Sequence, residues 1–104
     1  MSASLLTKWI GGSAGVKPGR HSKISWPFGK LTMYQDHLVI RLFFMTLELD
    51  YSRIQVIRKG FFLNALVKHT DSSAPDYISL FGIGLLDDIR RTNRRDRLDL
   101  KVLS

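Results

Sequence analysis

The 104-residue sequence contains no cysteine. Disulfide bonds, thiolate nucleophiles and cysteine-ligated zinc or iron–sulfur centres are therefore excluded. Long hydrophobic runs are missing too: the apolar stretch 38–44 is interrupted by Arg41, whereas a membrane-spanning helix needs about 20 apolar residues. The apolar stretch 5–10 is too short for a secretory signal and contains Lys8. We expect a cytoplasmic protein. Peripheral contact with a membrane is compatible with this expectation.

Acidic residues are scarce relative to basic ones, which gives a net charge of +7. Residues 1–25 carry four basic residues and no acid, residues 26–81 carry six and five, and residues 82–104 carry six and four. Hydrophobic residues make up 44% and charged residues 24%, a composition typical of one folded domain. Because more than half of the net charge lies near the N-terminus, the total charge alone does not identify an anionic partner.

Patterns of catalytic residues are also missing. The three histidines do not stand at metal-ligand spacing, and neither a nucleophile elbow nor a phosphate-binding glycine loop is found. Asp36 beside His37 is the one tempting pair, but neighbouring side chains in a strand or turn are expected to point apart. We therefore predict no enzyme activity, no catalytic residue, no metal site, no cofactor and no small-molecule substrate.

The first 23 residues combine a short apolar cluster with several glycines, a composition typical of a flexible leader. The apolar cluster would share one side of a short helix and insert into an anionic bilayer surface. A disordered tail, or docking on the domain itself or on a neighbouring subunit, remains the alternative. The leader residues predicted to act as an anchor are Leu5, Leu6, Lys8, Trp9 and Ile10.

Apolar and polar residues alternate from Trp26 onward, which is typical of half-buried strands. The clearest alternation, at 45–50, predicts an apolar inner face and an acidic outer face. We therefore place a β domain at 24–104. The predicted strands cover 30–34, 38–42, 45–50, 54–59, 62–69 and 77–81.

A helix is predicted at 85–96, because Leu85 and Ile89 recur at helical spacing after two glycines. Aspartates at its start and arginines at its end would complement the helix dipole. The alternating segment 98–102 predicts one more strand, which could add to the sheet edge of another chain.

Three segments together resemble the bacterial branch of the pleckstrin-homology-like (PH-like) superfamily. They are Trp26-Pro27-Phe28-Gly29-Lys30-Leu31-Thr32, Asp36-His37-Leu38-Val39-Ile40-Arg41 and Tyr51-Ser52-Arg53-Ile54. The resemblance covers about residues 24–96. It implies a mainly β fold with one C-terminal helix, a partly open barrel of two roughly orthogonal antiparallel sheets. It also implies binding of phosphoinositides, peptides or other subunits.

Two groups of residues are candidates for contact with a partner. Lys30 and Arg41 fit the spacing of the basic signature in phosphoinositide-binding members, although Val39 stands where that signature has a basic residue. The helix arginines suit phosphate or carboxylate, the alternative being a solvated helix face. The candidates for membrane or anion binding are Lys30, Arg41, Arg90, Arg91, Arg94 and Arg95. The interface candidates are Phe43, Phe44, Phe61 and Phe62.

The sequence favours a non-catalytic interaction or scaffolding module that binds protein partners or itself, with an anionic membrane surface as the leading non-protein ligand. The alternative is a nucleic-acid-binding protein, which the net charge permits. Nucleic acid is the less favoured partner, because the strands show no stripe of basic residues and aromatics for stacking exposed bases.

Overall fold

The computed structural model describes residues 4–17, 20–42, 45–60, 64–72, 75 and 77–103. Its elements are β1 (Leu6–Lys17), β2 (Arg20–Met33), β3 (His37–Leu42), β4 (Met45–Asp50), the 3-10 turn η1 (Tyr51–Arg53), β5 (Ile54–Lys59), β6 (Asn64–His69), β7 (Tyr77–Phe81), α1 (Leu85–Asp96) and β8 (Val102–Leu103). The fold is mainly β with one helix near the C-terminus, as the sequence predicted.

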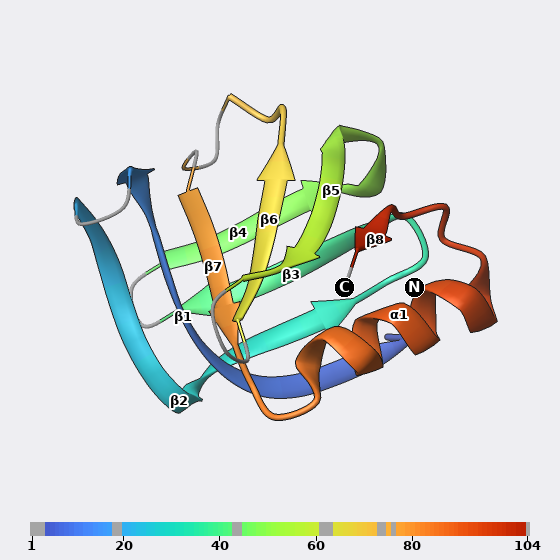
Figure 1. Ribbon diagram of the computed structural model, residues 1–104, viewed down its shortest axis with the longest axis horizontal. Coiled ribbons are helices and arrows are strands. Elements are labelled where there is room, and N and C mark those ends of the chain that lie inside the picture. Colours follow the sequence, from blue (N-terminus) through green and yellow to red (C-terminus); the bar gives the residue numbers. More distant parts are fainter. Residues whose placement is uncertain are drawn as a thin grey trace.

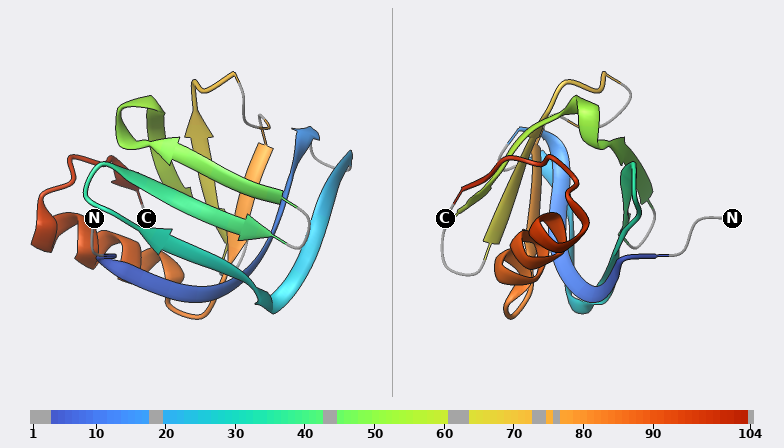
Figure 2. Two further views of the ribbon diagram at one scale, coloured as in Figure 1. Left: turned by 180° about the vertical axis from the view of Figure 1, so that it is seen from behind. Right: turned by 90° about the vertical axis from the view of Figure 1, so that its right-hand side faces the viewer.

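The strands form one eight-stranded sheet in the order β4-β3-β2-β1-β7-β6-β5-β8, which is not closed into a barrel. Neighbouring strands are antiparallel except β5 and β8, which run parallel. The sheet folds back on itself into two layers, with β3, β4 and the second half of β2 on one side and β5, β6 and β7 on the other (Figure 1). Strand β1 bends from the first layer into the second (Figure 2).

The segment predicted to be a flexible leader is instead the strand that joins the two layers. Leu6–Lys17 pairs with β2 along most of its length and with β7 through 11–15. A Cβ atom on Gly12 would lie 2.6 Å from the carbonyl oxygen of Ser79, so glycine lets these two backbones approach. The leader prediction is therefore wrong for β1, and β2 begins at Arg20, before the predicted domain boundary.

The strand predictions after residue 36 are largely confirmed, and α1 covers the predicted helix 85–96. The glycine before the helix has a physical reason: Gly84, the N-cap, has a φ of 69°, a conformation that side chains disfavour. Leu85 and Ile89 are buried, and α1 packs against β1 and β6 below the two layers (Figure 2).

The C-terminal segment returns to the sheet of its own chain. The Asn93 side-chain amide donates to the carbonyl of Leu100 at 2.8 Å and accepts from the Leu100 N–H at 3.0 Å. Leu98 and Leu100 are buried in the core, and β8 then pairs with β5. The strand predicted at 98–102 is mostly wrong: residues 98–101 are not in a strand, and β8 covers only Val102–Leu103, with its partner in the same chain.

Candidate functional site

The outer face of β1, β2 and β3 carries a row of cross-strand neighbours. Trp9 on β1 pairs with Lys30 on β2, and Lys30 pairs with Arg41 on β3. Ile10 and Leu31 are fully buried, and successive residues of a strand point to opposite faces. The core positions thus force Trp9, Lys30 and Arg41 to the solvent side.

Phe28 lies on the same face, next to an irregularity in β2. After the pair Ile10–Gly29 the register shifts, so that residues 25–28 of β2, a proline among them, lie opposite one residue of β1. A bulge of this kind re-aims the side chains beside it. Between Phe28 and Lys30 stands Gly29, where a Cβ atom would lie 2.9 Å from the Ile10 carbonyl oxygen. Glycine therefore lets the backbones of β1 and β2 approach closely at this point.

We call Trp9, Phe28, Lys30 and Arg41 the aromatic–cationic patch. The residues Trp9 and Phe28 are 59% and 72% exposed, which is high for large aromatics. Together with Leu42 the four residues line a shallow hollow of about 310 Å³. The ammonium group of Lys30 lies 5.6 Å from the centre of the Trp9 ring, within the range of a cation–π interaction.

The cations of the patch are available to a ligand. Within the described part of the chain, neither Lys30 nor Arg41 has a carboxylate within ion-pair distance. A guanidinium and an ammonium group can hold phosphate or carboxylate oxygens, and the two rings offer apolar or stacking contact. The patch therefore combines two ways of contacting an anionic, partly apolar partner.

No family model, curated protein or solved structure matches this chain. The PH-like resemblance therefore stays a prediction, and the site has to be interpreted from its own geometry. Among the described residues, no helix has the length and apolar character needed to cross a membrane.

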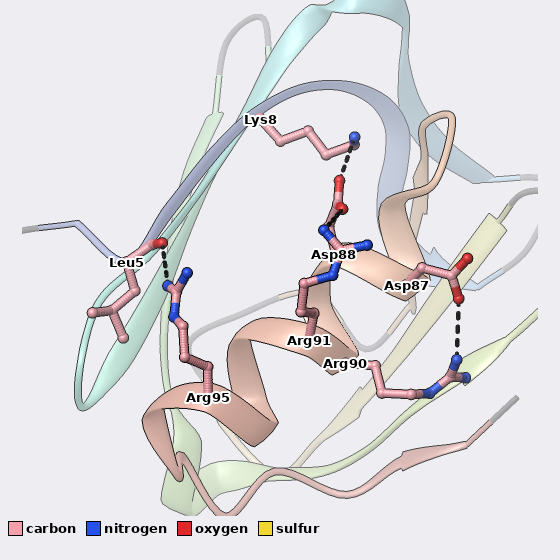
Figure 3. A network of polar contacts seen from close by, with 7 residues as sticks. All are labelled: Leu5, Lys8, Asp87, Asp88, Arg90, Arg91 and Arg95. Carbon is pink, nitrogen blue, oxygen red and sulfur yellow. Dashed lines mark hydrogen bonds and ion pairs between the residues drawn. The ribbon is translucent and has the colours of Figure 1, made fainter.

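The helix arginines contrast with the patch because most of them bind groups of the same molecule (Figure 3). The guanidinium of Arg90 lies 3.1 Å from an oxygen of Asp87. Arg95 contacts Asp96 at 2.9 Å and donates to the carbonyl of Leu5 at 3.0 Å.

Arg91 lies 3.6 Å from Asp88, and Arg94 is exposed with no ion pair recorded among the described residues. The structure thus brings Lys30 and Arg41 together, and it leaves the four helix arginines on a separate element.

The predicted anchor residues do not share one face. Leu5 and Leu6 are partly buried against the core, and Ile10 is fully buried. Lys8 makes a 2.7 Å ion pair with Asp88 at the start of α1, where the two side chains are 22% and 26% exposed (Figure 3). In a strand, Trp9 and Ile10 point to opposite faces, so Trp9 alone of the five lies exposed on the patch.

The predicted interface phenylalanines are not tested by the structure, and one patch residue was not predicted. The interface candidates Phe43, Phe44, Phe61 and Phe62 lie outside the residues that the structure describes. Phe28, by contrast, was not among the predicted site residues and belongs to the patch. Its spacing of two residues from Lys30 was the signal, because residues two apart on a strand share a face.

The Asp36–His37 pair does interact, which corrects the expectation that the two side chains point apart. The His37 Nδ1 atom lies 2.6 Å from an Asp36 carboxylate oxygen, and this hydrogen bond lowers the pKa of Asp36. The His37 ring also stacks on Tyr34 at 4.8 Å. Asp36 is 82% exposed and lies in the turn before β3, which begins at His37, so the pair is a surface contact outside the lining of the hollow.

Proposed function

We propose that this protein is a non-catalytic interaction module that docks on an anionic membrane surface through the aromatic–cationic patch. The observation that carries the proposal is the assembly of two exposed aromatics and two cations without a described carboxylate partner on one face. Tryptophan favours the membrane interface, and each basic residue near an anionic surface contributes about 1 kcal/mol.

The size of the patch favours a membrane over nucleic acid. Binding of a single strand requires a groove of positive charge that follows successive phosphates, together with stacking platforms. The described patch offers two cations around one shallow hollow. A membrane needs fewer specific contacts, because mobile headgroups gather around a small number of cations while the rings enter the interface.

The lining of the hollow supports a binding role without catalysis. Its residues are Trp9, Phe28, Lys30, Arg41 and Leu42. Among the described residues, this lining has two cations and no carboxylate, imidazole or hydroxyl group that would activate a nucleophile beside them. Such a lining suits recognition of charge and apolar area.

Co-sedimentation with vesicles tests the proposal. The wild-type chain should pellet with vesicles of phosphatidylserine and phosphatidylcholine, and much less with phosphatidylcholine alone. The variant Lys30→Glu/Arg41→Glu should lose at least about tenfold in partitioning, since two favourable charges become repulsive. Trp9→Ser/Phe28→Ser should lose binding at unchanged net charge, because the apolar contact is removed.

The matched control is Arg91→Glu/Arg94→Glu on α1, which changes the net charge by the same amount as the patch variant. It should reduce pelleting much less than Lys30→Glu/Arg41→Glu. Equal losses would mean that net charge alone attracts the chain to the vesicles, and the patch would then have no docking role.

Filter binding of a single-stranded oligonucleotide across salt concentrations tests the alternative that the patch binds nucleic acid. Patch-dependent oligonucleotide binding that falls steeply with salt, without patch-dependent vesicle binding, would assign the patch to nucleic acid instead.

A further inference from the structure

The two ends of the sheet differ in how they are protected against pairing with another strand. One end is β8, a strand of two residues, and very short edge strands are a common form of protection. The other end is β4, whose six residues pair with β3 in a continuous register from His37–Asp50 to Leu42–Met45. Strand β4 has no bulge, no proline and no lysine, and its charged side chains are the two acids Glu48 and Asp50, so its edge is protected only against strands that also carry negative charge.

The ladder alternation identifies the backbone groups on the free side of β4. The N–H of Tyr51 donates to the carbonyl of Asp36, which continues the β3–β4 ladder beyond its last pair. Because hydrogen-bonded and non-hydrogen-bonded pairs alternate in an antiparallel ladder, Leu47 and Leu49 bond to β3. Thr46, Glu48 and Asp50 therefore direct their N–H and C=O groups to the free edge, where no described strand pairs with them.

The side chains along this edge indicate the chemistry of an occupant. Thr46, Glu48 and Asp50 are exposed, while Leu47 and Leu49 on the inner face are buried. The Glu48 carboxylate has His37 as its described neighbour, 3.7 Å away, and is 68% exposed. An added strand would thus meet acidic residues on one face and the apolar side of the core on the other.

A second copy of the same edge does not fit this pattern. Two β4 strands pairing antiparallel about Glu48 would place the two Glu48 carboxylates opposite each other, and like charges in cross-strand pairs are unfavourable. A strand with basic residues at the outward positions and apolar residues at the inward positions matches the edge.

We propose that the free edge of β4 binds an extended segment of a partner protein in which basic residues alternate with apolar residues, adding a ninth strand to the sheet. Main-chain hydrogen bonds from Thr46, Glu48 and Asp50 hold the segment, and the carboxylates select its basic side chains. This docking edge adjoins the aromatic–cationic patch, because Thr46 of β4 pairs with Arg41 of β3. Its free backbone groups point away from β3, and its occupancy does not depend on the membrane function proposed above.

A short fluorescent peptide of alternating lysine and valine is the probe, and its anisotropy with the full chain is the measurement. A glutamate–valine peptide is the charge control. The first peptide should bind and the second should not. Thr46→Pro removes an outward N–H at an edge position that tolerates proline, and it should weaken binding by about tenfold or more. Glu48→Lys/Asp50→Lys should weaken it similarly.

Amide hydrogen exchange of the wild-type chain tests strand addition to β4 without any variant, so the test holds even if a variant fails to fold. Saturating lysine–valine peptide should slow exchange at Thr46, Glu48 and Asp50, and should leave Leu47 and Leu49 unchanged. Absence of binding, equal binding of both peptides, or binding without this alternating protection would overturn the proposal. Trp9→Ser/Phe28→Ser changes residues of β1 and β2 at unchanged net charge and should bind the lysine–valine peptide as wild type does, so the two proposals can fail separately.

Discussion

The basic residues of α1 and those of the aromatic–cationic patch show how differently one residue type is used in two regions. On the helix side, Lys8, Arg90 and Arg95 bind carboxylates or carbonyls of the same chain. On the outer face of the sheet, Lys30 and Arg41 have no carboxylate partner within the described residues. The densest basic cluster of the sequence is thus largely engaged internally, and the sparser pair is the one offered to a ligand.

The largest effect should come from the apolar contact that positions the helix. Ile89 is a buried residue of α1 that packs into the core, so Ile89→Ala should lower the free energy of unfolding by about 2–5 kcal/mol. Phe28→Ala in the exposed patch should change it by about 0.5 kcal/mol or less. Urea denaturation measures both. A comparable loss in the two variants would remove the distinction between a structural helix side and a ligand-facing patch.

The buried hydroxyl group of Tyr51, directly after β4, is another polar group that bonds within the same molecule. Tyr51 donates to the carbonyl of Tyr34, and its burial raises its pKa well above the ordinary value of 10.0. Below pH 10 the hydroxyl is protonated in both the folded and the unfolded state. As pH rises further, the unfolded chain loses this proton first, so the free energy of unfolding must fall.

Tyr51→Phe tests this expectation. The variant should be about 1 kcal/mol less stable than wild type near neutral pH, because the hydrogen bond to Tyr34 is lost. The gap should shrink as the pH rises above 10, since the variant has no hydroxyl to ionise. Urea denaturation at several pH values gives the comparison, and a constant gap would contradict the role assigned to the Tyr51 hydroxyl.

The smallest effect should come from the ion pair that joins β1 to α1. A double-mutant cycle with Lys8→Met and Asp88→Asn should give a coupling energy of about 0.5–1 kcal/mol, because both side chains remain partly exposed. The cycle separates this pair from the contact between Asp88 and Arg91. The coupling should decrease with salt. A coupling of zero would show that Lys8 is as free as the patch cations.

Local patterns predicted much of the fold. Alternation identified β3, β4, β5 and β7, and the helix was predicted at its observed bounds, since glycine, aspartate and arginine positions agree with the apolar spacing. The pattern failed for β1, where Gly11, Gly12 and Gly15 suggested flexibility. The role of these glycines depends on how closely the backbone of the distant strand β7 approaches β1. A local sequence pattern does not reveal that distance.

The candidate site was predicted only in part, because it too depends on pairing between strands that are distant in the sequence. Lys30 and Arg41 were paired by their spacing along a hairpin, and the β2–β3 register places them side by side. Trp9 joins them through the pairing of β1 with β2, a contact hidden once β1 was interpreted as a leader. The pairing of β1 with β2 places Trp9 beside Lys30, and the sequence alone does not show which strands pair.

The double pairing of β1 has a consequence for the order of folding. Gly11 pairs with Phe81, so β1 cannot complete its pairing until β7, which follows it after five other strands, has been synthesised. Contacts between such distant residues slow folding, because a long loop must close before they form. Until then the edge of β1 that faces β7 stays unpaired, and unpaired strand edges of incompletely folded chains can pair with neighbouring chains.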